Sequence, residues 1–176
     1  GAKVNAFEAP LFFPDGNSDL PVGLSNAYVE SVNNEEAARL LDDAASDLLL
    51  VYGTGLIKPH VFAAPRFGAI NAHGGKLPGY RGLDTNLWAT YEGHPEDMRV
   101  TWHQVDSELD TGDVYFEEPV PFDPRLSIYS LRYFTAVICT EMCLALLENL
   151  AAGKLIGRRH EKSMSKYYGP MPWLLK

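Results

Sequence analysis

Two short apolar runs constrain what this chain can fold into more than any other feature. They cover residues 47–52 and 67–73, and glycine follows each run. Apolar runs of this length are typical of parallel strands that are covered on both faces of a sheet. The sequence therefore predicts two buried strands.

Other patterns fill the chain around these runs. Alternation of apolar and polar residues predicts a strand at 99–105, and another strand is predicted at 113–120, where Pro121 marks an edge or an end. Helical spacing predicts helices at residues 34–45, 59–63, 85–91 and 127–150. Strands that alternate with helices predict an α/β fold, with a sheet that is parallel at its start and antiparallel at its end.

Capping signals support two of the helices. Asn34 is followed by two acidic residues, which predicts an N-cap and a favourable first turn. Ser127 predicts the start of the long helix, and Gly153 predicts its C-terminal cap. One face of this helix is predicted to be apolar, through Ile128, Leu131, Phe134, Ile138, Met142, Ala145 and Leu150.

The remaining segments carry weaker signals. Residues 3–7 are predicted as a strand, and residues 10–21 and 77–83 as loops. Residues 154–176 are predicted as a tail. The whole chain is expected to be a single domain, residues 1–176.

Asn71 and His73, at the end of the second buried strand, give the first chemical signal. Residues i and i+2 of a strand point to the same side, so both side chains are expected to face one cleft. An Asn amide can donate to a carbonyl oxygen that becomes negative during nucleophilic attack, which is worth ~10²–10³-fold in rate. A His can take the proton that an attacking amine loses, worth roughly 10²–10⁴-fold.

Asp110 lies in a short acidic turn after the strand at 99–105 and could hold the imidazole or receive its proton through water. Residues 53–55, 71–73 and 106–112 all follow predicted strands. Ligands of α/β sheets bind beyond the carboxyl ends of the strands. These three segments are therefore expected to meet at one edge and to perform acyl transfer to an amine.

Other kinds of site fit the sequence less well. His73, His103, Asp106 and Asp110 lack any recognised zinc-ligand spacing, so no metal is expected. The Gly-Thr-Gly at residues 53–55 lacks the third glycine of a dinucleotide fingerprint. No Ser or Cys lies in a Gly-x-Ser-x-Gly context.

Composition limits the partners. The net charge is −8 and no Lys/Arg cluster occurs, so no nucleic acid partner is expected. No apolar run approaches the ~18–20 residues of a membrane span, so no membrane partner is expected. Cys139 and Cys143 are expected to pack in the core, in a reducing, cytoplasmic compartment. The long helix has apolar residues to spare, which suggests a homodimer contact.

These motifs together resemble the folate-dependent formyltransferase family. Its signature is a strand ending in Asn-x-His, a Leu-Pro-x-Tyr-Arg-Gly loop, a helix, and a Val-Asp-x-x-Leu-Asp-Thr-Gly turn. The resemblance covers roughly residues 33–153, and the motifs follow in the same order and spacing, at residues 71–73, 77–82, 87–89 and 105–112.

The resemblance implies a Rossmann-like fold and transfer of a formyl group from the co-substrate N10-formyltetrahydrofolate to a primary amine. Asn71, His73 and Asp110 match the family's catalytic trio. Residues 52–57 match the segment that lines the pterin pocket, and residues 105–110 match the loop that reads the pterin edge. Folate contacts are accordingly expected from Gly55, Leu56, Ile57, Val105, Asp106 and Leu109.

The acceptor is less constrained. Family acceptors include glycinamide ribonucleotide, amino sugars on nucleotides, and methionyl-tRNA. The acidic chain argues against tRNA, and residues 80–82 and 88–89 look like those of amino-sugar enzymes. The expected acceptor is therefore a small-molecule amine, either a nucleotide-linked amino sugar or a ribonucleotide amine.

Two departures from the family pattern lie near the acceptor side. Gly-Gly-Lys at residues 74–76 replaces the common Pro-Ser-Leu, and Thr85 stands where many members have proline. The strand–helix unit that usually precedes residue 34 is expected to be short or missing. Alternatives to transfer are a formyltetrahydrofolate hydrolase and a folate-binding module without catalysis.

Overall fold

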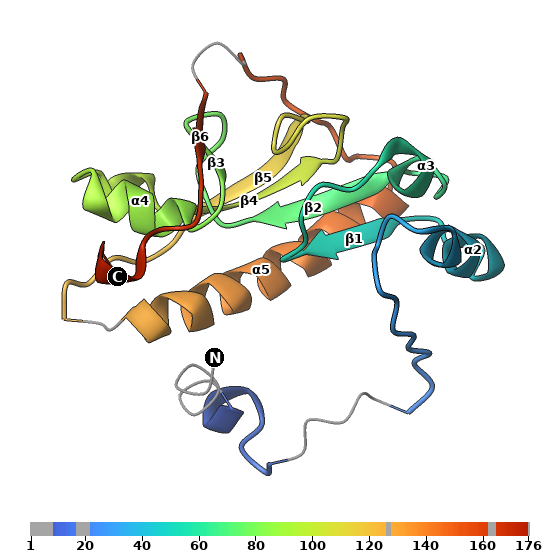
Figure 1. The fold of residues 1–176 in the computed structure, drawn as a ribbon, viewed down its shortest axis with the longest axis horizontal. Helices are drawn as coiled ribbons and strands as arrows, with labels where there is room; N and C mark the ends of the chain where they lie inside the picture. Colours follow the sequence, from blue (N-terminus) through green and yellow to red (C-terminus); the bar gives the residue numbers. More distant parts are fainter. Residues whose placement is uncertain (1–8, 17–21, 126–127, 162–164, 176) are drawn as a thin grey trace.

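A four-stranded mixed sheet forms the centre of the protein (Figure 1). The computed structural model describes residues 9–16, 22–125, 128–161 and 165–175. The sheet has the order β1-β2-β4-β5, where β1 and β2 are parallel and the other pairs are antiparallel. Its strands are β1 (Leu49–Tyr52), β2 (Ala69–His73), β4 (Arg99–Gln104) and β5 (Val114–Pro119). The predicted α/β class is confirmed.

Helices flank this sheet. The longest, α5 (Ile128–Ala151), runs along one face, whereas α4 lies at the opposite end of the sheet from α2 and α3 (Figure 1). The shorter helices are α2 (Glu35–Asp43), α3 (Pro59–Phe62), α4 (Thr85–Tyr91) and the 3₁₀ turns η1 (Pro95–Asp97) and η3 (Trp173–Leu175). Each predicted helix is therefore present, with ends shifted by a few residues at most.

Two helix caps form as the sequence predicts. The Asn34 side chain accepts a hydrogen bond of 2.8 Å from the backbone N–H of Ala37, which satisfies a donor that the first turn of α2 leaves free. After α5, Gly153 adopts a positive φ of 65°. The Lys154 N–H then reaches back to the Asn149 carbonyl at 2.8 Å, closing a Schellman-type end. Ser127 lies outside the described residues.

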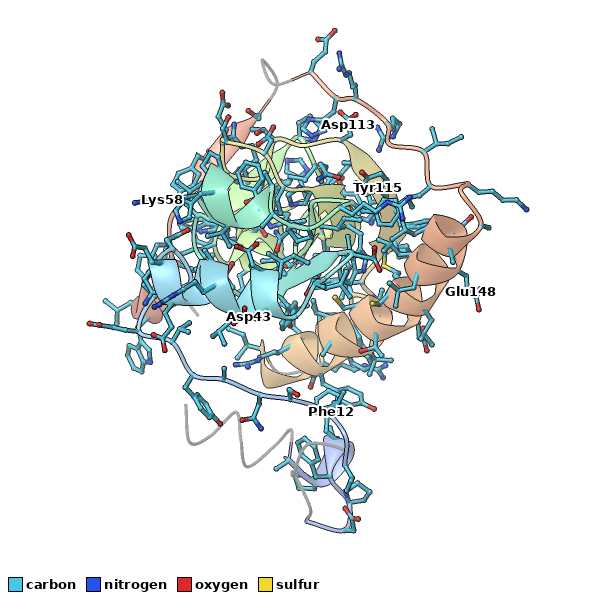
Figure 2. All side chains as sticks on the ribbon, turned by 90° about the vertical axis from the view of Figure 1, so that its right-hand side faces the viewer. Phe12, Asp43, Lys58, Asp113, Tyr115 and Glu148 are labelled. Carbon is cyan, nitrogen blue, oxygen red and sulfur yellow. The ribbon has the colours of Figure 1, made fainter. Side chains whose placement is uncertain are left out.

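The main core lies between α5 and the sheet. Ile70 and Ala72 of β2 face α5, while Asn71 and His73 alternate to the other face. Figure 2 shows side chains filling this layer, with Glu148 pointing away from it. The stripe predicted on α5 holds in part, because Ala145 is exposed. The apolar side chains that α5 buries most deeply are Cys139, Met142 and Leu146.

The prediction that residues 47–52 are buried on both faces is wrong. Leu50 is 39 % exposed and Tyr52 is 54 % exposed. The reason is strand order, since β1 is the outer strand of the described sheet and has a hydrogen-bonded neighbour only on the β2 side. Val51 lies on the face of β1 opposite Leu50 and Tyr52. It is buried there, because it packs with Ile57, Val61 and Ala69 in a second, smaller core.

The C-terminal residues differ most from expectation. The sequence predicts a loop at residues 77–83 and a tail at residues 154–176, yet β3 (Tyr80–Gly82) and β6 (Lys166–Tyr168) pair in a parallel two-stranded sheet. Residues 9–12 are helical, although a loop is predicted from residue 10 onward, and residues 3–7 lie outside the described part. Pairing between segments more than 80 residues apart leaves no local sequence pattern.

The long helix also corrects an expectation about length and hydropathy. Within residues 130–151, a window of 18 residues has a mean hydropathy of 1.5, so by length and composition alone this helix could cross a membrane. The sequence pattern hid this because Glu141 and Glu148 interrupt the apolar run. A single helix of this kind is weak evidence for a membrane span, and in this structure α5 packs on the sheet.

Candidate active site

Strand register brings four polar side chains to one face of the sheet. Asn71 and His73 lie on β2, and they pair in register with His103 and Thr101 of β4. Asp110 follows β4 in a turn and reaches back toward them. His73, His103 and Asp110 are buried, each less than 7 % exposed. The structure thus brings together all three residues that the sequence singled out.

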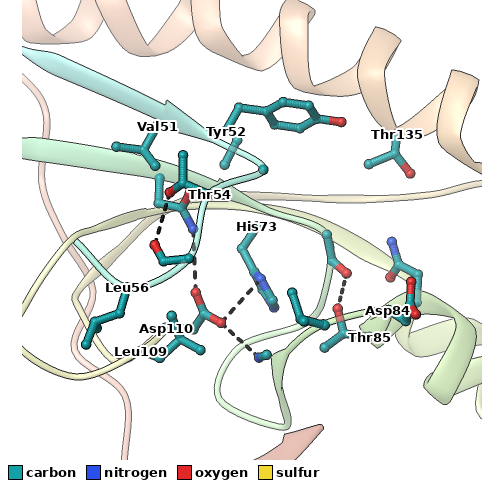
Figure 3. A pocket seen from close by; sticks show the side chains of 18 of the residues that line it. Val51, Tyr52, Thr54, Leu56, His73, Asp84, Thr85, Leu109, Asp110 and Thr135 are labelled. Carbon is teal, nitrogen blue, oxygen red and sulfur yellow. Dashed lines mark hydrogen bonds and ion pairs between the residues drawn. The ribbon is translucent and has the colours of Figure 1, made fainter. Parts of the chain in front are cut away.

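Asp110 is the centre of a cluster that it forms with Asn71, His73 and His103. Its Oδ2 lies 3.6 Å from His73 Nδ1, and its Oδ1 lies 3.4 Å from His103 Nε2. The Asn71 amide nitrogen is 3.5 Å from Oδ1 and 3.1 Å from His103 Nε2. Figure 3 shows the Asp110 carboxylate beside the His73 ring. One carboxylate therefore touches every other member of the cluster.

The turn that carries Asp110 is held from several directions. Asp110 has a φ of 53°, in the left-handed region, and its Oδ2 accepts a 2.9 Å hydrogen bond from the Gly82 N–H. Arg81 Nε donates to the Leu109 carbonyl at 2.8 Å. Inside the turn, Thr111 donates to Asp106 Oδ1 at 2.5 Å. These hydrogen bonds fix the position of the carboxylate, and two of the three come from β3.

Hydrogen bonding determines which nitrogen of His73 carries its proton. His73 Nε2 lies 2.7 Å from the carbonyl oxygen of Tyr80, and a carbonyl can only accept. Nε2 is therefore the protonated atom, and Nδ1 is the free base that faces Asp110. A proton taken by Nδ1 would lie beside the Asp110 carboxylate, which stabilises the imidazolium.

The pKa values of the two groups fit this arrangement. Burial lowers the pKa of His73, and the nearby Asp110 offsets this only in part. Burial raises the pKa of Asp110, but hydrogen bonding from His103 and the charge of His73 outweigh it and lower the pKa overall. Near neutral pH, His73 is consequently a neutral base and Asp110 a carboxylate.

His103 is the residue that sequence reasoning missed as part of this cluster, having considered it only as a metal ligand. Its Nδ1 lies 2.8 Å from the Gln104 carbonyl oxygen, and its Nε2 lies 3.1 Å from the Asn71 amide nitrogen and 3.4 Å from Asp110 Oδ1. The sequence signal that could have found His103 is its place two residues after Thr101 on an alternating strand, which puts both side chains on the same face. Among the described residues, no group of three or more His, Cys, Asp or Glu side chains is arranged to hold a metal ion.

The cluster opens into a pocket of about 1380 Å³ with two differing walls. The first, which we call the strand-end wall, follows β1 and β4 and consists of residues 51–57, 105, 106, 108 and 109. It includes all the residues expected to contact folate: Gly55, Leu56, Ile57, Val105, Asp106 and Leu109. All six therefore border the same cavity as the cluster, and their contact with folate stays a prediction.

We call the second side the C-terminal wall. It combines residues 83–87, the first turns of α5 at Ile128, Leu131, Arg132 and Thr135, and the end of the chain at Trp173 and Leu174. In Figure 3, Leu56 and Leu109 lie on one side of His73, whereas Asp84, Thr85 and Thr135 lie on the other. Two ligands, one bound on each wall, would meet at the cluster.

The two departures from the family pattern prove to be in contact. The Thr85 hydroxyl donates to the Gly74 carbonyl, as drawn in Figure 3. A Cβ on Gly75 would lie 2.6 Å from Thr85 Oγ1 and 2.7 Å from His73 Nε2. Only glycine fits there while Thr85 and His73 keep their positions. Gly75 and Thr85 therefore form one packing unit beside the cluster.

Known proteins similar to this chain are formyltransferases. A family model described as formyl transferase matches residues 17–136. Methionyl-tRNA formyltransferase of Geotalea uraniireducens is 32 % identical over 137 residues, which make up 77 % of this chain and 43 % of that protein. The chain spans 43 to 50 % of the length of three such curated relatives.

Solved structures show the same likeness. The formyltransferase PseJ from Anoxybacillus kamchatkensis, in complex with UDP-4,6-dideoxy-4-formamido-L-AltNAc and tetrahydrofolate, is 28 % identical with a TM-score of 0.61, covering 70 % of this chain and 64 % of that one. A 4-N formyltransferase from Francisella tularensis gives a TM-score of 0.64 at 16 % identity, over 95 % of this chain and 62 % of that one, and shows the fold alone. The chain belongs to the formyl transferase family.

Proposed function

We propose that this protein transfers a formyl group from N10-formyltetrahydrofolate to the primary amine of a small substrate, and that residues 1–176 act as one catalytic domain. The observation that carries the proposal is the cluster of Asn71, His73 and Asp110 at the junction of two pocket walls. A two-substrate transfer needs such a junction, because donor and acceptor must meet at one proton-accepting group.

The strand-end wall suits the donor. Leu56, Ile57, Val105 and Leu109 give it apolar surface, and Gly55 leaves backbone groups accessible. A pterin is a flat ring with hydrogen-bonding edges, which such a surface can hold. The relative PseJ was solved with tetrahydrofolate bound, which supports the same ligand for this chain.

In the proposed reaction the amine nitrogen attacks the formyl carbon, and the carbonyl electrons move to the oxygen. Asn71 donates to that oxygen. The Asn71 amide nitrogen lies 3.5 Å from Asp110 Oδ1, which is a long hydrogen bond. Replacing that bond with one to the negative oxygen therefore costs little. Nδ1 of His73 takes the amine proton, directly or through one water, beside the Asp110 carboxylate.

Collapse of this intermediate re-forms the carbonyl and breaks the bond between the formyl carbon and N10. The proton held by His73 passes to N10, so the products are a formamide and tetrahydrofolate. Asp110 keeps its carboxylate throughout, since its pKa is lowered by the same groups that it touches.

For the acceptor we propose an amino sugar, linked to a nucleotide, with a ribonucleotide amine as the related choice. PseJ, solved with a UDP-linked 4-formamido sugar, supports this reading. A second candidate is methionyl-tRNA, because three curated relatives carry that activity. A net charge of −8 opposes the binding of a polyanion, which favours the small amine.

The test is a transfer assay with N10-formyltetrahydrofolate and a panel of acceptors: nucleotide-linked 4-amino sugars, glycinamide ribonucleotide and methionyl-tRNA. Mass spectrometry should show the gain of one formyl group on an amino sugar. Formate release without any amine would instead indicate a hydrolase. Binding of tetrahydrofolate by calorimetry, with no turnover on any acceptor, would contradict the enzymatic proposal and favour a folate-binding module.

A further inference from the structure

The end of the chain is fastened to the pocket rim by several independent contacts. β6 pairs with β3, the Trp88 indole donates to the Gly169 carbonyl at 2.9 Å, and Met171 N–H donates to Asp84 Oδ2 at 2.8 Å. The Tyr168 ring stacks on Tyr80 with 5.2 Å between centroids. Residues 166–171 are therefore a fixed part of the fold.

Gly82 shows how closely this segment is fitted. It has a φ of 101°, and a Cβ there would collide with the carbonyl oxygen of Tyr168. The same Gly82 donates its N–H to Asp110. The backbone that orients the catalytic carboxylate is thus the backbone on which the C-terminal strand lies.

Directly after this anchored stretch, two large apolar side chains are left uncovered at the pocket. Trp173 is 84 % exposed and Leu174 is 87 % exposed, and both line the cavity. The other tryptophans, Trp88 and Trp102, are half-buried and buried. A well-anchored backbone that presents an uncovered indole to a pocket offers a flat apolar surface with little ordering cost on binding.

The location of these side chains separates them from the proposed donor site. The Met171 N–H is hydrogen-bonded to Asp84. In Figure 3, Asp84 lies on the side of His73 opposite Leu56 and Leu109. Trp173 follows Met171 by two residues and lines the same pocket as Ile128 and Leu131 in the first turns of α5. The uncovered indole therefore belongs to the side from which the acceptor would approach.

We propose that Trp173, with Leu174 beside it, forms a subsite that binds a ring of the acceptor by stacking. This inference rests on the proposed formyl transfer and deepens it. The ligand chemistry is a flat ring face, either the C–H face of the amino sugar or the base of its nucleotide. The subsite is a binding and specificity element, and the indole takes no part in bond making.

The experiment measures KM and kcat for the acceptor UDP-4-amino-4,6-dideoxy-L-AltNAc and for the same amino sugar without UDP, in wild type and Trp173→Ala. We expect KM for the UDP-linked acceptor to rise about tenfold, in line with stacking on an aromatic ring. The KM for N10-formyltetrahydrofolate should stay unchanged. Trp173→Phe, which keeps a flat ring, should recover most of the lost affinity.

Tyr28→Ala is the matched control. Tyr28 is 94 % exposed but does not line the pocket, so its removal should change neither KM. A KM penalty shared by the free and the linked sugar assigns the stacking to the sugar ring. A penalty for the linked sugar alone assigns it to the base, and both results support the subsite.

Three outcomes would overturn the inference: an unchanged acceptor KM, a raised donor KM, or a change only in the association of Trp173→Ala in solution. A fluorescence titration with the same UDP-linked probe keeps the test independent of turnover. Wild-type emission should change on binding while Trp173→Phe emission does not. If no wild-type activity is found, the proposed function fails, and the titration alone decides whether the subsite exists.

Discussion

The two walls of the pocket are built in different ways. The strand-end wall comes from the last residues of β1 and from residues that follow β1 and β4, so its position is fixed by where two strands end. The C-terminal wall joins segments near residues 85, 130 and 173, which are far apart in the sequence. The proposed donor side is thus a product of local pattern, whereas the proposed acceptor side is assembled only by tertiary contacts.

The largest expected effect comes from removing the base that both walls share. His73→Ala should lower kcat by roughly 10²–10⁴-fold, because it removes the Nδ1 base that takes the amine proton in the proposed reaction. Tetrahydrofolate affinity should remain, since the strand-end wall is untouched. The measurement is a steady-state transfer assay beside calorimetry with tetrahydrofolate. Full transfer by the folded variant would refute the mechanism.

Gly75→Ala tests the packing unit next to the C-terminal wall. Its new Cβ would lie within 3 Å of Thr85 and His73, so the free energy of unfolding should fall by about 1–3 kcal/mol. Transfer should fall as well, because the His73 ring must move. Denaturant unfolding gives the stability change.

The double variant Gly75→Ala/Thr85→Ala provides the control for that reasoning. It removes the hydroxyl that lies 2.6 Å from the new Cβ, so part of the lost stability should return. Non-additive free energies would show that the two sites interact. Strictly additive losses would show that Gly75 and Thr85 act separately.

A smaller effect is expected at the strand-end wall. Leu56 is 51 % exposed within the pocket, and Leu56→Ala should raise the dissociation constant for tetrahydrofolate by about tenfold or less, through lost apolar contact. The KM of the acceptor should not change. Leu144→Ala, at an exposed position of α5 outside the pocket, is the matched control, and calorimetry is the measurement. An acceptor effect at Leu56 would break the division between the walls.

The smallest effect concerns pH. The lowered pKa of His73 means that kcat/KM should fall with decreasing pH only below the ordinary value of 6.5, as the base becomes protonated. His103 contributes to that lowering, so His103→Gln should move the midpoint to higher pH. Profiles of kcat/KM against pH would show the shift, and identical midpoints would exclude this coupling.

Local patterns determined much of the fold. The Asn34 cap, the Gly153 end of α5 and the limits of α4 are short-range features, in which neighbours along the chain supply the hydrogen bonds. The facing of Asn71 and His73 is of the same kind, since alternation along a strand fixes it. These features could be read from the sequence because each depends on a few consecutive residues.

Features that depend on distant pairing could not be read in this way. The exposure of Leu50 depends on where β1 lies in the sheet, and the β3–β6 pair joins Tyr80 to Lys166. His103 enters the cluster because the antiparallel register places it opposite Asn71. Register and strand order depend on contacts summed over the whole chain, so a single segment does not encode them.

By itself the sequence determined the α/β class, the cluster residues Asn71, His73 and Asp110, and the six residues of the strand-end wall expected to touch folate. Only the tertiary structure decided that His103 joins the cluster, that Gly75 and Thr85 pack as a unit, and that Trp173 lies at the pocket. The physical reason is range: hydrogen bonding and alternation act between near neighbours, whereas burial and pairing act between residues that only the folded chain brings together.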